Sequence, residues 1–243
     1  MVENRILRSL PAAEWERLRS HSTTVSLTTR QIIYERQQTI DHILFVESGV
    51  ISQVTDTDDI EVGLVGFEGI VGGIALLQEV NAVLRTIVQA DGKAWVIEAT
   101  TARTLLNECP VFRALCYQYL HVVMGNTAQL VGCNLRHGLN ERLSRWLLMF
   151  RDRLQGDCLP ITHEFIAGML GVRRPGITLA LRSMQGRGLI RQSRGRLRIL
   201  DSVQLEAEAC SCYQTMKRLY TDCMFRTQIG NQRERREYQR CGD

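Results

Sequence analysis

The sequence predicts an α+β protein with a β sandwich or barrel in its first half, followed by a long helix and a helix-turn-helix. Three observations support this fold class. Short β-type runs punctuated by glycine recur between residues 24 and 99, and helical periodicity replaces them after Thr100. The segment 161–200 then carries eight arginines against one acid, Glu164, a net charge of +7.

The first hundred residues are expected to form a short helix and then an antiparallel sheet domain. Residues 4–20 have the spacing of an amphipathic helix, with Leu7, Leu10, Trp15 and Leu18 on one face. The β-type runs that follow are 31–35, 42–54, 61–69, 85–90 and 94–99. Since no long helix separates these runs, a parallel βαβ sheet is excluded.

The middle of the chain is expected to contain one unusually long helix. A short helix at 101–109 ends before Pro110, and a long one spans about 111–136. Its predicted apolar stripe consists of Phe112, Leu115, Tyr119, Val122, Val123, Leu130 and Cys133. Either the protein's own β domain or a second copy of the helix could cover this stripe, and we expect the second copy. A further helix is expected at 140–154, with a linker at 155–160.

Residues 162–182 satisfy the local requirements of a helix-turn-helix. Thr162 can cap the first helix, and Glu164 lies in its first turn, at the positive end of the helix dipole. Gly171 supplies the turn, where a side chain would be strained. Pro175 falls in the first turn of the second helix, where its missing N–H costs nothing. The inward positions are Ile166, Ala167, Leu170, Val172, Ile177, Ala180 and Leu181.

The outward positions of this segment are basic and predict a DNA-binding surface. Arg173 and Arg174 stand at the start of the second helix, and each could contact either base edges or phosphate. Arg182 is expected at phosphate, and Thr178 and Leu179 also face outward. A two-stranded wing follows, in which Ile190, Leu197 and Ile199 alternate with arginines around a turn at Arg194-Gly195. The predicted DNA-binding residues are Thr162, Arg173, Arg174, Thr178, Arg182, Arg191, Arg194 and Arg196.

The first hundred residues are acidic, in contrast to the basic segment 161–200. Residues 1–100 contain eight basic and fourteen acidic residues, so two domains with different partners are expected. No secretory signal or run of eighteen apolar residues is present, and we expect a cytoplasmic protein that does not enter a membrane. The sequence has no GxSxG, phosphate-loop, HExxH or paired-carboxylate motif, so no enzymatic activity is expected. The tail at 233–240 is expected to be a frayed, solvated end.

The eight cysteines are irregularly spaced, which predicts reduced thiols rather than a disulfide framework. Cys210 and Cys212 stand two residues apart on an expected helix, nearly on opposite faces. They could not then chelate one ion together, so no metal site is predicted. No spacing among His21, His42, His121, His137 and His163 argues for haem.

The order of these parts resembles the cyclic-AMP receptor protein/Fnr (Crp/Fnr) family of bacterial transcription regulators. The resemblance covers about 5–226 and is carried by ITHEFIAGMLGVRRPGITLALRSMQGRGLI with its wing, and more weakly by GFEGIVGGIALL and LRTIVQA. It implies a jelly-roll sensor domain at 1–109 resembling cyclic-nucleotide-binding domains, a dimerisation helix at 110–137 and a winged helix-turn-helix domain at 138–243. It further implies a homodimer that binds a two-fold symmetric operator on double-stranded DNA through the recognition helix 173–186. RNA polymerase is an implied partner if the protein activates transcription.

The chain departs from the family at its effector site. Where nucleotide-binding members have Gly-Glu and Arg-Ser pairs, this chain has Gly72-Gly73 and Arg85-Thr86. The missing carboxylate would leave a ribose hydroxyl unsatisfied at a cost of about 1–3 kcal/mol. Thr127 falls where family members contact the base. Gly72, Arg85, Thr86 and Thr127 are therefore effector candidates, but cyclic AMP is not expected to bind in the usual way.

Two further departures concern iron and base contacts. Fnr-type members hold an iron–sulfur cluster through N-terminal cysteines, whereas the first cysteine here is Cys109, so no such cofactor is expected. Family members that bind the best-known half-sites carry Glu and, four residues later, Arg, where this chain has Pro175 and Leu179. A different, guanine-containing half-site is expected. The alternative function is a cyclic-nucleotide-binding signalling module whose basic domain docks an acidic protein.

Overall fold

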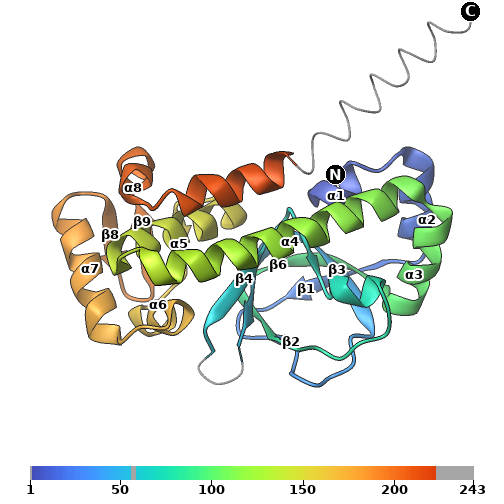
Figure 1. Cartoon of the computed structure of the whole chain (residues 1–243), viewed down its shortest axis with the longest axis horizontal. Helices are drawn as coiled ribbons and strands as arrows, with labels where there is room; N and C mark the ends of the chain where they lie inside the picture. The colour runs from blue at the N-terminus through green and yellow to red at the C-terminus, as the bar shows by residue number, and fades with distance from the viewer. Residues whose placement is uncertain (1, 56–58, 223–243) are drawn as a thin grey trace, which may run out of the picture.

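The computed structural model describes residues 2–55 and 59–222, which form a β domain, a long central helix and a mainly helical domain (Figure 1). The tail at 233–240 lies outside the described residues. No helix among the residues described is long and apolar enough to span a bilayer. The predicted α+β class is confirmed.

Two short helices begin the chain where one helix was predicted. They are α1 (Arg5–Arg8) and α2 (Ala12–Ser20). The side chain of Asn4 caps α1 by accepting hydrogen bonds from the backbone N–H groups of Ile6 and Leu7. Pro11 occupies the cap position of α2, and its ring disfavours the helical conformation of the residue before it. The prediction of one continuous helix over 4–20 was therefore wrong.

The β domain is built on two long antiparallel strands, β3 (His42–Val54) and β6 (Arg85–Glu98). Four short strands flank them: β1 (Thr23–Leu27), β2 (Ile32–Tyr34), β4 (Glu61–Val65) and β5 (Ile70–Val71). The first half of β6 pairs with β2 and its second half with β1, while β5 and β4 pair with the two halves of β3. The register of β3 against β6 shifts around Gly49, whose φ is +88°. The strands predicted at 85–90 and 94–99 are one continuous strand, β6.

Helical elements connect the β domain to the second domain. A 3-10 turn, η1 (Gly73–Leu76), and helix α3 (Ala99–Glu108) precede the long helix α4 (Pro110–Arg136). The remaining elements are α5 (Leu139–Leu154), β7 (Cys158–Leu159), α6 (His163–Leu170), α7 (Arg174–Gly186), β8 (Ile190–Ser193), β9 (Arg196–Ile199) and α8 (Ser202–Glu208), and residues 212–222 are also helical. The helix of residues 212–222 runs beside α4 (Figure 1), and Gly125 of α4 lies against Leu219.

The predicted apolar stripe of α4 packs against the protein's own domains. Phe112, Leu115, Tyr119, Val122 and Cys133 are all buried within the single chain. The expectation that a second copy covers this stripe was therefore wrong, because the β domain and the C-terminal part of the chain already do so.

The two domains share apolar packing. One core fills the β domain, and a second joins α5, α6 and α7. Val50, Val54 and Leu64, from the hairpin of β3 and β4, belong to that second core. The turn residue Gly171 lies against Ile60 of the same hairpin. The β domain therefore contacts the helix-turn-helix directly.

The chain leaves the helical conformation between α8 and the helix of residues 212–222. Ala209, Cys210 and Ser211 are not helical. The expectation that Cys210 and Cys212 lie on one continuous helix, with their side chains on opposite faces, was wrong. This interruption lets both side chains reach the same buried cluster with Cys133.

Candidate nucleic-acid interface

The helix-turn-helix forms as its sequence signals indicate. The Thr162 hydroxyl caps α6 by accepting a hydrogen bond from the Phe165 N–H at 3.2 Å. Gly171 ends the helix with a φ of +62°, and the Val172 N–H donates to the Ala167 carbonyl across the turn. This left-handed geometry favours glycine, since a side chain there would be strained.

The second helix, α7, is fixed by its buried face. It begins at Arg174, with Arg173 as its cap residue, so the helix is one residue shorter than the predicted 173–186. Ile177, Ala180, Leu181 and Met184 are buried on its inner side. Arg173, Arg174, Leu179 and Arg182 are exposed on the outer side. The side chains predicted to face a DNA groove therefore point away from the core.

One of these arginines has an intramolecular partner. Arg174 Nε lies 3.5 Å from Glu164 Oε2, and both side chains are largely exposed. Such exposed pairs contribute little, typically about 0–1 kcal/mol, so the pair can yield to an incoming phosphate or base. Among the described residues, Arg173 and Arg182 make no ion pair.

A histidine that the sequence interpretation did not use joins the two helices to the wing. His163 Nδ1 lies 3.0 Å from the Thr178 hydroxyl, and its Nε2 lies 2.6 Å from Gln192 Oε1. The backbone N–H of Gln192 donates in turn to Gln185 on α7. The half-buried Thr178 thus already has a hydrogen-bond partner, and the network links the recognition helix to the wing.

The wing is a β-hairpin whose outer face is arginine. β8 and β9 pair antiparallel, with Arg191 opposite Arg198 and Ser193 opposite Arg196. Ile190, Leu197 and Ile199 are buried beneath, and the turn at Arg194-Gly195 has a φ of +72° at the glycine. Like charges directly opposite on paired strands repel, so this face favours an anionic partner. Arg187, by contrast, pairs with Glu208 at 2.6 Å.

The effector candidates are not brought together into one site. A cavity of about 700 Å³ lies between the β domain and α4, and Gly72 and Thr86 line it along with mostly apolar residues. Arg85 does not line this cavity. Its side chain pairs with Glu35 and Asp59, each at 3.5 Å. The Thr127 hydroxyl donates to the Val123 carbonyl of its own helix.

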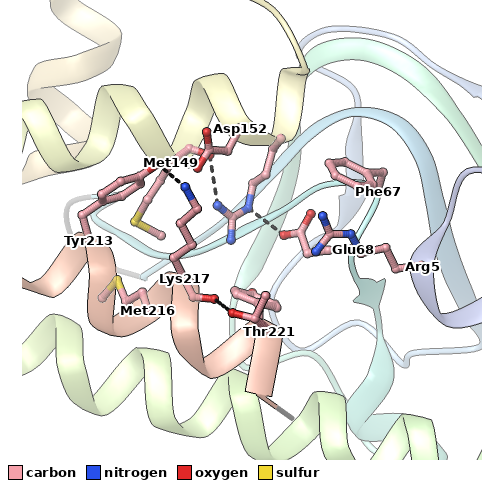
Figure 2. Close-up of a pocket in the computed structure, with 11 residues that line it drawn as sticks. Arg5, Phe67, Glu68, Met149, Asp152, Tyr213, Met216, Lys217 and Thr221 are labelled. Atoms are coloured by element: carbon pink, nitrogen blue, oxygen red, sulfur yellow. Dashed lines mark hydrogen bonds and ion pairs between the residues drawn. The ribbon is translucent and has the colours of Figure 1, made fainter. Parts of the chain in front are cut away.

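A second pocket of about 290 Å³ lies at the junction of the two domains (Figure 2). Glu68, from the loop after β4, points into this junction and pairs with Arg153 of α5 at 2.8 Å. Arg153 also donates to the Leu64 carbonyl. On the far wall the Tyr213 hydroxyl donates to Asp152 at 2.7 Å. The contacts of Arg153 with Glu68 and Leu64 therefore tie the β domain to α5, the helix that precedes the helix-turn-helix.

The exposed side of α4 bears a stripe at alternating spacings of four and three residues. We call this the outward stripe: Tyr117, His121, Met124, Ala128, Val131 and Leu135, all exposed. Leu135 is 83% exposed and Met124 68% exposed. A 4-3 repeat of mainly apolar residues is the pattern of a coiled-coil seam.

Residues 141–208 match a family model described as a Crp-like helix-turn-helix domain. The chain is 30% identical over 172 residues to the transcriptional regulator LdrP of Thermus thermophilus, an alignment that covers 60% of this chain and 87% of LdrP.

Solved structures share the fold. FixK2 of Bradyrhizobium japonicum superposes with a TM-score of 0.66 at 13% identity, over 78% of this chain and 98% of FixK2. A transcriptional regulator of the CRP family from Thermus thermophilus superposes with a TM-score of 0.64 at 19% identity, over 76% of this chain and 96% of that one.

Proposed function

The chain belongs to the Crp/Fnr family of transcriptional regulators with a helix-turn-helix DNA-binding domain, and from this premise we propose that it binds a two-fold symmetric operator as a homodimer. One recognition helix, α7, would enter the major groove of each half-site. The observation that carries the proposal is the exposed arginine face shared by the start of α7 and the wing.

Base contacts are assigned to the first turn of α7. Arg173 and Arg174 are exposed at the N-terminal end of the helix, the end that reaches base edges in helix-turn-helix proteins. Arginine can donate two hydrogen bonds to guanine O6 and N7. Pro175 and Leu179 cannot donate to a base edge, so the two arginines are the donors of this turn. We therefore assign the half-site a guanine opposite one of them.

Phosphate contacts are assigned to the residues around this turn. Arg182 lies farther along α7, while Arg191, Arg194 and Arg196 line the wing, and Thr162 lies exposed at the N-terminus of α6. Contacts of this kind position a protein on the duplex without selecting sequence. They would make binding steeply dependent on salt concentration.

The outward stripe of α4 is assigned to the dimer seam. Its members are all exposed in the single chain, and burial of an apolar coiled-coil seam favours pairing. A parallel pair of α4 helices would place two α7 helices on one side of the dimer, as a two-fold operator requires.

The β domain is proposed as a sensor that does not bind cyclic AMP in the usual way. The position of the missing carboxylate is Gly73, and Arg85 is engaged by two acids. A cyclic phosphate would have to displace both. The 700 Å³ cavity, with Ile70, Leu77, Val80 and Leu120 among its lining residues, suits a mainly apolar ligand instead.

Selection of bound duplexes from a random DNA pool tests the function. The expected product is an inverted repeat with half-site centres about one helical turn, or about 10 bp, apart. Enrichment of a single unrepeated site would contradict the dimeric arrangement. Equal binding to every sequence, with a steep salt dependence, would contradict the assigned base contacts and support the phosphate contacts alone.

A further inference from the structure

Three thiols and one imidazole converge at the C-terminal end of α4. We call them the thiol–imidazole cluster: Cys133, His137, Cys210 and Cys212. Cys133 lies on the last turns of α4, and His137 is the cap residue of that helix. Cys210 lies in the break that follows α8, and Cys212 is the first residue of the helix of residues 212–222. The three cysteines are buried, and His137 is partly buried.

The four donor atoms have the spacing of ligands around a single ion. All lie within 4.8 Å of one another. Cys133 Sγ is 3.5 Å from Cys210 Sγ, and Cys212 Sγ is 3.5 Å from His137 Nδ1. Around a tetrahedral Zn²⁺, bonds of ~2.3 Å to sulfur and ~2.0 Å to nitrogen set separations of ~3.8 Å between two sulfurs and ~3.5 Å between sulfur and nitrogen. The sulfurs are too far apart for a disulfide, which needs ~2.0 Å.

We propose that the thiol–imidazole cluster binds one Zn²⁺ ion, which fastens the end of α4 to the C-terminal part of the DNA-binding domain. Thiolate and imidazole ligands in tetrahedral arrangement select zinc among common divalent ions. Donors this closely gathered enclose one ion, whereas a multi-iron cluster needs cysteines spread around several metal atoms. The site uses none of the residues assigned to DNA.

The surroundings supply the charge that such a centre needs. On binding, the three thiols release their protons to solvent, so Zn²⁺ with three thiolates has a net charge of −1. Arg145 of α5 is only 2% exposed and interacts electrostatically with both Cys133 and Cys210. Among the described residues, Arg145 Nε has no hydrogen-bond partner, and its Nη1 donates to the sulfurs of Met149 and Met216. The carboxylate of Glu61 also interacts electrostatically with Arg145, and an anionic metal centre would further compensate this buried cation.

An outer hydrogen bond and a backbone contact hold the ligands in place. Gln129 Nε2 donates to Cys212 Sγ at 3.1 Å, as partners outside a metal's ligand shell commonly do. The backbone N–H of Cys210 donates to the Glu141 carbonyl at the start of α5. Because these anchors come from α4 and α5, the ion would hold the DNA-binding domain at one angle to the long helix.

The test measures metal in the tag-free full-length protein purified under reducing conditions. Elemental analysis is expected to find about one zinc per chain, lost in Cys133→Ser and in Cys212→Ser. Cys158→Ser is the matched control, since Cys158 is exposed on β7, outside the cluster. Cobalt substitution is expected to give the visible bands of tetrahedral thiolate coordination in the wild type and the control only.

A milder variant guards against loss of folding in the cysteine variants. His137→Gln alters a partly buried ligand at the helix end, and circular dichroism checks that the fold remains. Loss of an outer hydrogen-bond partner alone costs about 10–100-fold in metal affinity, so loss of this ligand is expected to cost at least as much in competition with a chelator.

Four results would overturn the proposal. The first is less than one zinc per ten chains after incubation with zinc chloride and gel filtration. The second is unchanged zinc in a Cys133→Ser/Cys212→Ser double variant. Iron with acid-labile sulfide in place of zinc is the third, and a disulfide between Cys133 and Cys210 in the reduced preparation is the fourth.

Discussion

Arg153 of α5 and Glu68 of the loop after β4 form an ion pair in which Nε and Oε1 are 2.8 Å apart and each side chain is only 7% exposed. Arg153 also donates to the carbonyls of Leu64 and Met149. One guanidinium therefore joins the β domain to the helix that supports the helix-turn-helix. Since both charges are removed from water, each depends on the other for compensation.

The first prediction concerns this pair. Glu68→Gln leaves the Arg153 charge buried without its carboxylate, and it is expected to lower the free energy of unfolding by about 3–5 kcal/mol. Urea denaturation at pH 7 measures the loss. The matched control is Glu108→Gln, whose pair with Arg17 is largely exposed and should change stability by less than about 1 kcal/mol. Equal effects of both variants would mean that burial does not strengthen the Glu68 pair.

The second prediction concerns Glu61, another link between the domains. Its carboxylate accepts hydrogen bonds from Ser52 and from Trp146 of α5. Burial raises the pKa of Glu61 to about 7, against the lowering influence of these two hydrogen bonds. Between its ordinary pKa and about 7 the folded state therefore holds a proton that the unfolded state has lost, so stability falls as pH rises through this window.

Glu61→Gln removes this titration. The variant should lose the part of the pH slope that Glu61 contributes, at most about 1.4 kcal/mol per pH unit between roughly pH 4.5 and pH 7. Denaturation at a series of pH values measures it, with the exposed Glu79→Gln as control. The same slope in wild type and Glu61→Gln would show that Glu61 ionises normally in the folded protein.

The third prediction tests the dimer seam. Met124→Asp places a charge in the outward stripe, at a side chain that is 68% exposed in the single chain and lies at the edge of the 700 Å³ cavity. It should yield folded monomers by light scattering and abolish tight operator binding. Asn134→Asp, exposed on the same helix beside the stripe, should leave the dimer intact. A dimer that persists in Met124→Asp would place the interface elsewhere. Val123 is unsuitable for this test because it packs against the core of the β domain.

The sequence predicted the elements of this protein better than it predicted what covers them. Capping by Thr162 and the turn at Gly171 are local, and the structure contains both. The stripe of Phe112 and Tyr119 was assigned to the right helix but to the wrong neighbour. Helical periodicity shows which face is apolar, but it cannot show whether the same chain or another covers that face.

Contacts between residues distant in sequence also could not be predicted from the sequence. The thiol–imidazole cluster depends on a helix break at Ala209–Ser211, where no proline or glycine signals it. The bonds of His163 to Thr178 and Gln192 span three elements. His163 lies one residue after a predicted cap, and its position next to a helix start was the one available signal.

The fourth prediction separates base contacts from phosphate contacts by comparing two exposed arginines. Arg174→Ala, at the start of α7, should cost about 1–3 kcal/mol on the selected operator and relax base preference at one position. Arg196→Ala, on the wing, should weaken binding to all sequences alike and lower the salt slope by about one phosphate contact. Fluorescence anisotropy over a range of salt concentrations, on operator and scrambled duplexes, measures both. Uniform weakening by Arg174→Ala would assign Arg174 to phosphate, and an unchanged salt slope in Arg196→Ala would remove the wing from the interface.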